Sequence, residues 1–276
     1  MYQLLKNQRI GFIGAGNMAQ AMIKGLIEGG YISAERILVS NRSHGKLNKL
    51  KEQYQIQTFD NNESLVENSD IVILAMKPQD LLSAVEPISQ SFNDDQIVMS
   101  IAAGIKMPVL EKNLPQCRLV RVMPNTPSVI GQGVVGYFIN EDNETVEDIV
   151  ENLFRPLGKV MHVHDEDEFD ALMIACSSGT GFVFELMMYW QEWLEEHDFT
   201  PEQARMMAVD TFLGASLLAK HHLDLSIEEL QSRVTSKKGV TAAGLQSMRE
   251  LEIERALRIS FEKADLRNKE MSKEFK

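Results

Sequence analysis

The sequence predicts an α/β protein with an N-terminal Rossmann-type, doubly wound sheet and an all-helical C-terminal domain. Two observations support this fold class. Short apolar runs with the character of buried strands alternate with helical patterns over the first half of the chain, as in parallel α/β sheets. Beyond Thr145 the sequence shows mainly helical patterns. We therefore expect two domains, residues 1–160 and 161–276.

The first strand, turn and helix lie in the segment Ile10–Ala19. An apolar run is followed by Gly14-Ala15-Gly16, and an amphipathic pattern then starts at Asn17 and Met18. Gly14 permits a tight turn, Gly16 lets the backbone approach a pyrophosphate, and Ala19 is small enough for the helix to pack on the strand. The helix N-terminus would present free N–H groups to that anion. This segment predicts a dinucleotide site.

The remaining strands of the first domain follow from short apolar runs. Asp70–Met76 is continuous in the way of a strand buried on both faces, and a helix is expected from about Asp80 to Gln90. The other predicted strands are Arg36–Ser40, Ile56–Thr58, Gln96–Ile101 and Arg118–Met123.

The second domain is predicted to be helical throughout. The expected helices are Glu147–Leu157, Asp167–Glu196, Pro201–His222, Ser226–Val234 and a charged helix from about Arg249 to the end. The helix that contains Phe182, Trp190 and Trp193 is apolar on most sides and therefore needs cover from other helices. The cover is either a core within the chain or a helical dimer interface.

The second strand ends in Ser40-Asn41-Arg42-Ser43. An NAD-selective site usually has an acidic residue here for the ribose 2′-hydroxyl, and this chain has none. Arg42 can instead pair with a 2′-phosphate, so the pattern favours NADP over NAD. The alternative is a solvent-exposed turn without a ligand.

Three further segments could carry binding or chemistry. Lys77-Pro78 follows the fourth strand directly, where ligand-binding loops of such sheets lie. Arg121–Pro127 ends a strand in a stiff turn with two prolines. Val234–Thr241 interrupts the helices with hydroxyls and a glycine, and a loop that enters a helix can present N–H groups to a carboxylate.

Taken together, these motifs resemble the pyrroline-5-carboxylate reductases over essentially the whole chain. The resemblance rests on Gly14–Met18, Asn41–Ser43, Ala75–Gln79, Val122–Pro127 and Val234–Leu245. It implies NADPH-dependent reduction of a cyclic imine to L-proline, by residues 1–160 as NADP-binding domain and residues 161–276 as substrate and dimerisation domain. It also implies a homodimer, in some members assembled into a ring of dimers.

The resemblance and the motifs together predict the site residues. Thr241 and Lys77 are the expected catalytic residues. The expected substrate-binding residues are Thr235, Ser236, Gly239, Val240 and Thr241. The expected cofactor-binding residues are Gly14, Gly16, Asn17, Met18, Asn41, Arg42, Ser43, Asn61, Ala75, Lys77, Pro78 and Asn125.

The substrate region departs from the family pattern. Ser178 and Gly179 match a Ser-Gly pair of the family, but Thr180 stands where the family has a proline, and Lys237 and Lys238 replace a Pro and a Gly. Glu192-Trp193-Leu194 stands where the family has Asp-Gly-Gly. Reduction of another imine or oxo acid, or NADPH binding without turnover, are therefore the alternative functions.

Composition and charge limit the partners, the compartment and the metal sites that we expect. The net charge of −12 argues against a nucleic-acid partner. The two cysteines are too few for a disulfide framework, and no uncharged run reaches the roughly 18 residues that span a bilayer, so we expect a cytoplasmic protein without a membrane partner. His162 and His164 alternate on an expected strand, but no third ligand is placed beside them, and we expect no metal site.

Overall fold

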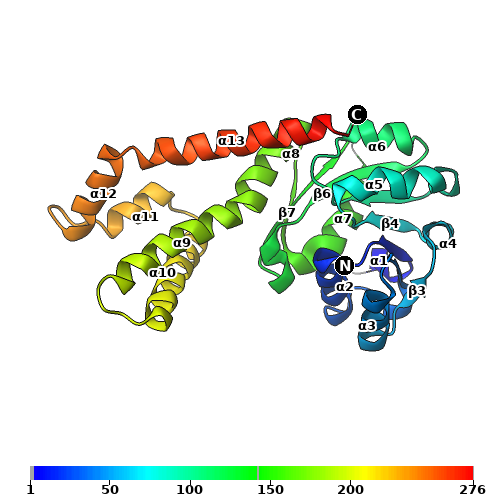
Figure 1. The fold of residues 1–276 in the computed structure, drawn as a ribbon, viewed down its shortest axis with the longest axis horizontal. Helices are drawn as coiled ribbons and strands as arrows, with labels where there is room; N and C mark the ends of the chain where they lie inside the picture. Colours follow the sequence, from blue (N-terminus) through cyan, green and yellow to red (C-terminus); the bar gives the residue numbers. More distant parts are fainter. Residues whose placement is uncertain (1–2, 142, 276) are drawn as a thin grey trace. The chain divides into compact units, whose positions relative to one another are not determined.

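The computed structural model describes residues 3–141 and 143–275 (Figure 1). The chain forms two compact units. The first contains the residues up to Ser178 together with those from Ala264 onward, and the second is Gly179–Lys263. The last part of the chain therefore packs with the first unit, and the buried side chain of Phe275 belongs to its core.

The first unit contains one eight-stranded sheet in the order β3-β2-β1-β4-β5-β6-β7-β8. All neighbouring strands are parallel except β6 and β7. This is the Rossmann-type order with two additional strands at one edge, so the predicted fold class is confirmed. The strands are β1 Ile10–Ile13, β2 Ile37–Ser40, β3 Gln57–Phe59, β4 Ile71–Leu74, β5 Ile97–Ser100, β6 Arg118–Met123, β7 Gly133–Ile139 and β8 Gly158–His162.

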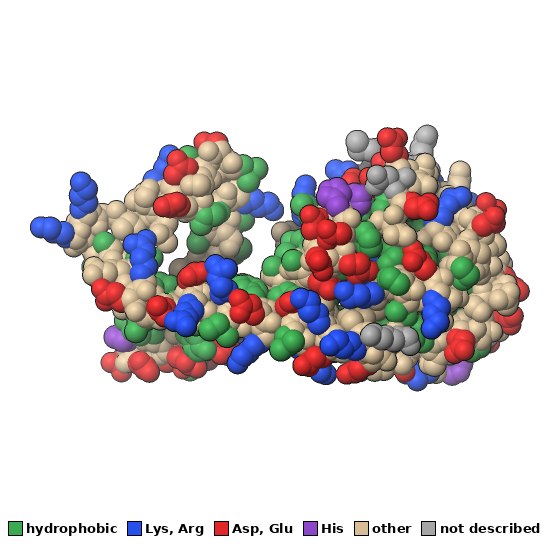
Figure 2. All heavy atoms as spheres, turned by 90° about the horizontal axis from the view of Figure 1, so that it is seen from above, with side chains coloured by type: hydrophobic (Ala, Val, Ile, Leu, Met, Phe, Trp, Pro, Cys, Tyr) green, Lys and Arg blue, Asp and Glu red, His purple; other side chains and the backbone are tan. Residues whose placement is uncertain are grey.

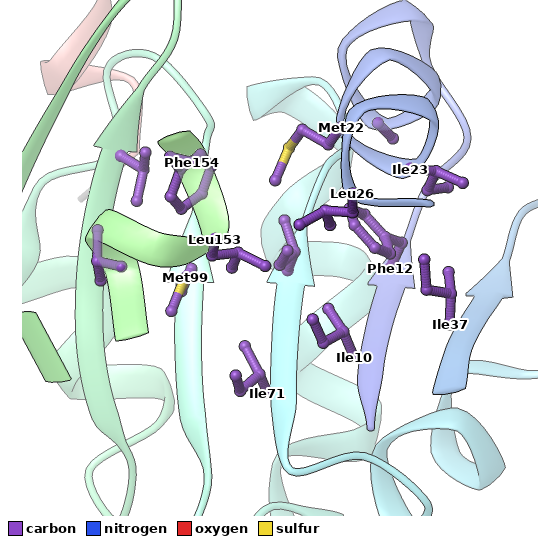
Figure 3. Packing of buried hydrophobic residues seen from close by; sticks show 14 of the residues in the cluster. Ile10, Phe12, Met22, Ile23, Leu26, Ile37, Ile71, Met99, Leu153 and Phe154 are labelled. Atoms are coloured by element: carbon purple, nitrogen blue, oxygen red, sulfur yellow. The ribbon is translucent and has the colours of Figure 1, made fainter. Parts of the chain in front are cut away.

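Side chains of the central strands alternate between two buried clusters, one on each face of the sheet. Ile71 and Ile73 belong to the first cluster, and Val72 and Leu74 to the second. This period of two explains why the strands are continuously apolar, because both faces are covered by helices. Figure 3 shows how Met22, Ile23 and Leu26 of one helix, and Leu153 and Phe154 of another, pack over the first face. The core thus fixes the carboxyl ends of β1, β2 and β4.

The expected helices occur in the expected order, and Gln3–Lys6, Asn62–Glu67 and Met107–Asn113 are additional short helices that were not predicted. The helices are α1 Gln3–Lys6, α2 Asn17–Glu28, α3 His44–Tyr54, α4 Asn62–Glu67, α5 Pro78–Val85, α6 Met107–Asn113, α7 Glu144–Phe154, α8 Glu166–Leu172, α9 Gly179–Glu195, α10 Pro201–His221, α11 Ile227–Arg233, α12 Val240–Glu250 and α13 Ile253–Lys273. The last helix, expected from about Arg249, begins at Ile253 as α13, because Arg249 and Glu250 end α12 and Glu252 with φ 51° separates the two helices.

The expected helix Asp167–Glu196 is not a regular α-helix throughout. Met173–Ser178 forms a π-helical segment between α8 and α9. Within it the carbonyl of Cys176 accepts a hydrogen bond from the side chain of Asn125. This widened turn is a feature that often marks functional sites.

The helical unit buries very little apolar surface of its own. In Gly179–Lys263 the buried hydrophobic residues are Ala204 and Ala208. Ring contacts join Trp190 to Phe212, with centroids 5.2 Å apart, and Phe182 to Phe261, at 5.3 Å. Figure 2 shows hydrophobic side chains on the surface of these helices among charged ones. The apolar helix faces identified in the sequence are therefore not covered within this unit.

Candidate functional site

The glycine turn between β1 and α2 has the geometry of a dinucleotide site. Gly14 has φ +107°, and a Cβ at this position would lie 2.5 Å from the carbonyl oxygen of Ala75, so only glycine fits. Gly16 is the N-cap of α2 and makes no side-chain cap hydrogen bond. The first N–H groups of α2 thus lack a side-chain cap, and the local backbone suits a pyrophosphate.

The end of β2 and the residue after it, Asn41, fix this turn. The N–H of Gly14 donates to the carbonyl of Ser40 at 2.9 Å. The N–H of Ala15 donates to the Asn41 side-chain oxygen at 3.1 Å, and the Asn41 amide donates to the carbonyl of Ser43 at 3.2 Å. The Asn41 side chain therefore joins the glycine turn to the backbone of Ser43 in the loop after β2.

A cleft of about 520 Å³ opens at the carboxyl ends of β1, β2 and β4, and we refer to it as the switch-point cleft. It lies where the strand order reverses, which is where open α/β sheets bind their ligands. Of the predicted cofactor-binding residues, those that line it are Gly14, Gly16, Asn41, Arg42, Ala75 and Lys77. Those that do not are Asn17, Met18, Ser43, Asn61, Pro78 and Asn125.

Arg42 lies at the mouth of this cleft. Its side chain is 87% exposed, and the guanidinium forms an ion pair of 3.0 Å with Asp80 of α5. Asp80 also lines the cleft, and the sequence analysis did not identify it because it comes from a helix behind a different strand. An exposed guanidinium at the end of β2 can pair with a phosphate group on the ribose.

Asn61 and Asn62 have different roles. The side-chain oxygen of Asn61 accepts from the N–H of Ser64 at 2.8 Å and caps α4. Asn62 lines the cleft and accepts a hydrogen bond from Ser40 at 2.8 Å.

Lys77 and Pro78 form the start of α5. Lys77 is the N-cap, and Pro78 occupies the first turn, where its missing N–H costs nothing. The side chain of Lys77 lines the cleft, as expected from its place directly after β4.

Asn125 holds together three segments at the end of β6. Its side-chain oxygen accepts from the N–H of Val134 at 3.0 Å, and its amide donates to the carbonyl of Cys176 at 3.1 Å. Ser177 contacts the carbonyl of Pro124 at 3.5 Å. The two-proline turn is thereby joined to β7 and to the π-helical segment.

A buried ionic cluster lies behind that turn. Arg121 on β6 is 1% exposed, pairs with Glu166 and places its guanidinium 4.1 Å from the centre of the Phe169 ring. Burial lowers the pKa of Arg121, and the charges of Glu166 and Asp170 oppose this effect. Asp170 also pairs with Lys106 at 3.3 Å. Arg121 was expected only as part of the turn, although a charged residue inside an apolar strand indicates an ionic partner.

The late loop Thr235–Thr241 belongs to the helical unit. The Thr235 hydroxyl donates to the carbonyl of Gln231 at 2.7 Å, and the N–H of Gly239 donates to the carbonyl of Ser236 at 3.0 Å. Gly239 is the N-cap of α12 without a side-chain cap hydrogen bond, and Val240 and Thr241 are exposed. This loop thus offers a hydroxyl and uncapped N–H groups.

Lys238 adopts φ +62°, a conformation that favours glycine. This is the position where the family pattern has a glycine. The backbone therefore keeps the expected path despite the substitution.

The two histidines that alternate along β8 and the loop after it, His162 and His164, contact aromatic rings. His162 stacks on Tyr137 with ring centroids 4.8 Å apart, and His164 lies against His162. Within residues 3–141 and 143–275, no group of three or more His, Cys, Asp or Glu side chains is arranged to hold a metal ion.

Comparisons with known proteins cover both parts of the chain. The family described as NADP oxidoreductase coenzyme F420-dependent matches residues 9–104, and pyrroline-5-carboxylate reductase dimerisation matches residues 166–271. The pyrroline-5-carboxylate reductase of Haemophilus influenzae is 32% identical over 87% of this chain and 89% of its own length. Pyrroline-5-carboxylate reductase 1 of Bacillus spizizenii is 32% identical over 99% of this chain and 92% of its own length. The solved structure of a pyrroline-5-carboxylate reductase from Coxiella burnetii has a TM-score of 0.90 and 33% identity, covering 96% of this chain and 99% of that one.

Proposed function

The chain belongs to the pyrroline-5-carboxylate reductase family, and we propose that it reduces 1-pyrroline-5-carboxylate to L-proline with NADPH. The observation that carries this proposal is the similarity to reductases of this kind over nearly the full length, together with a glycine turn and an arginine at the switch-point cleft. The residues present fit an NADP molecule, because the Gly14 position excludes a side chain and Arg42 supplies a cation without an acid on β2.

In this proposal the switch-point cleft holds the cofactor. The start of α2, at Gly16, Asn17 and Met18, faces the pyrophosphate, and Arg42 pairs with the 2′-phosphate. Asn41, Ser43 and Asn61 act through the loops that they stabilise. Ala75, Lys77, Pro78 and Asn125 shape the side toward the nicotinamide.

When bound, the cofactor supplies a hydride to the imine carbon. The protein must then orient the imine, bind its carboxylate and exclude water. A protonated imine nitrogen makes the carbon electrophilic, and such an iminium forms in solution, so the chain needs no strong general acid. The buried ties from Asn125 to Val134 and Cys176 favour a rigid turn for this task.

We propose that the late loop binds the substrate carboxylate. Thr235, Ser236, Gly239 and Val240 form this anion site, and the hydroxyl of Thr241 contacts the ring nitrogen or the carboxylate. Uncapped N–H groups at the start of α12 support this role. Thr241 and Lys77 are the two proposed catalytic residues, with Lys77 beside the nicotinamide.

The division of labour along the chain is also a proposal: residues 1–160 bind NADP, and residues 161–276 bind substrate and form a homodimer, with a ring of dimers as a further possibility. The match to a dimerisation family and the uncovered apolar helices support the dimer. By length and composition the helix Glu166–Glu195 could cross a membrane. Dimerisation accounts for the same apolar residues, and we propose a cytoplasmic protein without membrane or nucleic-acid partners.

The test is oxidation of NADPH by the purified protein in the presence of pyrroline-5-carboxylate. Arg42→Asp should weaken NADPH use selectively. Thr241→Val keeps the shape but removes the hydroxyl, and turnover should fall roughly tenfold to a thousandfold while NADPH binding is unchanged. Thr145→Val, an exposed position on α7 outside the proposed site, is the matched control. Unchanged turnover in Thr241→Val would overturn the loop assignment.

A second candidate is reduction of another imine or of a 2-oxo acid, and a third is NADPH binding without turnover. The observation that favours them is the altered substrate loop, where Lys237 and Lys238 add positive charge. Parallel assays with several imines and 2-oxo acids distinguish reduction of pyrroline-5-carboxylate from reduction of another substrate. Tight NADPH binding without oxidation by any of them would indicate the third.

A further inference from the structure

The switch-point cleft contains an acidic residue from α5, the helix that follows β4. Among the described residues that line the cleft, Asp80 is the one acid, beside the cations Arg42, Lys46 and Lys77. Its carboxylate lies 3.0 Å from the Arg42 guanidinium and is 37% exposed. The N–H of Asp80 bonds to the carbonyl of Lys77, so the first turn of α5 holds it at the cleft.

A carboxylate at this place weakens the binding of NADPH and strengthens the binding of NADH. A 2′-phosphate carries nearly two negative charges at neutral pH, so it competes with Asp80 for Arg42 and is repelled by Asp80. A ribose with a free 2′-hydroxyl carries no such charge and can donate a hydrogen bond to a carboxylate, which is the contact that NAD-selective sites use.

We infer that Asp80 is a specificity-determining residue, which provides from α5 the carboxylate that the end of β2 lacks and thereby limits the preference for NADPH over NADH. The inference rests on the proposed role of Arg42 as the ligand of the 2′-phosphate. It concerns the binding of the adenosine end alone, so it affects KM and leaves the chemical step unchanged.

Asp80→Asn keeps the size of the side chain and removes its charge. The variant should lower KM for NADPH and raise KM for NADH, so the ratio of the two kcat/KM values should increase by about three- to tenfold, the range for one partly exposed charge near a surface. Values of kcat should stay the same. Glu86→Gln is the matched control, because Glu86 is an exposed acid at the end of the same helix that does not line the cleft.

Affinity for adenosine 2′,5′-bisphosphate and for 5′-AMP, measured by calorimetry, provides a second readout that needs no turnover. Asp80→Asn should bind the bisphosphate more tightly at low ionic strength, and the gain should shrink at about 0.3 M salt, where exposed charges are screened. Arg42→Met should lose affinity for the bisphosphate and not for 5′-AMP.

The outcomes separate the two proposals. If Arg42→Met weakens binding of the bisphosphate but Asp80→Asn leaves both the affinity and the kcat/KM ratio unchanged, the role of Asp80 is overturned and the cofactor site stands. If Arg42→Met has no effect, the assignment of Arg42 fails, and the inference about Asp80 fails with it. A change in Asp80→Asn equal to that in Glu86→Gln would show only an effect of net charge and would also refute the inference.

Discussion

Replacing Glu166 by Gln would leave the buried Arg121 guanidinium without its closest counter-charge. Arg121 is 1% exposed, and its other neighbours are the Phe169 ring and the carboxylate of Asp170. Glu166 also accepts a hydrogen bond from the N–H of Met107 at 2.7 Å. Gln can preserve that acceptor, so the substitution removes mainly the charge.

The expected loss of stability follows from these contacts. Removing one partner of a fully buried ion pair costs about 3–5 kcal/mol. Here the Glu166 side chain is 23% exposed, and both Asp170 and the Phe169 ring still stabilise the cation, so we expect about 2–3 kcal/mol for Glu166→Gln. Glu166→Ala should cost about 1 kcal/mol more, because the Met107 N–H loses its acceptor.

Urea unfolding followed by far-UV circular dichroism measures these differences. All variants must be compared at one protein concentration, because a dimer makes stability depend on concentration. The double variant Arg121→Met/Glu166→Gln should recover most of the loss, since no buried charge remains unpaired. Asp167→Asn, an exposed acid in the same first turn of α8, is the control. A Glu166→Gln protein as stable as this control, or a double variant less stable than Glu166→Gln, would refute the reasoning.

Three further predictions concern single positions. Lys238→Gly should stabilise the protein by about 0.5–1 kcal/mol in urea unfolding, because it relieves a side chain at φ +62°, and an unchanged midpoint would contradict the strain. Burial raises the pKa of the Cys117 thiol from 9.0 to about 11, so its contribution is complete below pH 9 and is lost as the pH rises to 11. Because the thiol is only partly buried and solvent reduces the effect, the original protein should lose about 1 kcal/mol more stability than Cys117→Ala between pH 8 and 11, and parallel pH profiles would disprove this. Asn61→Ala should lower stability by about 1 kcal/mol by removing the cap of α4 but raise the KM for NADPH less than Asn62→Ala, and the reverse order would contradict the separation of their roles.

The strands that could be predicted are those whose apolar runs are unbroken. Asp70–Met76 is buried on both faces, and β4 is found within it. Strand β7 was not predicted, because Gly133 and Gly136 interrupt its pattern. A Cβ at Gly136 would lie 2.5 Å from a methyl carbon of Leu172, and one at Gly133 would lie 2.0 Å from the Ser128 hydroxyl. Both glycines therefore reflect close packing, at Gly136 against the distant Leu172 and at Gly133 against the preceding turn, which an apolar strand pattern does not reveal.

The same limit applies to the candidate site. The glycine turn was predictable because one strand, one turn and one helix start follow each other within a short segment, although the close approach of the Ala75 carbonyl to Gly14 comes from the end of β4. Arg42 was predictable from its place after β2, but its partner Asp80 lies 38 residues later on another element. The π-helical segment at Met173–Ser178 was also unpredictable, since its helical period differs by a single widened turn from the regular α-helix expected there.

The two units differ in how much of their apolar surface is buried within a single copy of the chain. In the first unit, side chains from both faces of the sheet are buried and the switch-point cleft is lined by its own residues. In the helical unit, Trp193 is 59% exposed and Leu213 is 51% exposed, whereas Ala204 and Ala208 are the buried hydrophobic residues. Large exposed apolar patches of this kind usually mark a surface that another protein covers. Of the two kinds of cover that the sequence left open, a core within the helical unit does not account for these residues. The homodimer that we propose, formed through the segment that matches the dimerisation family, would cover them.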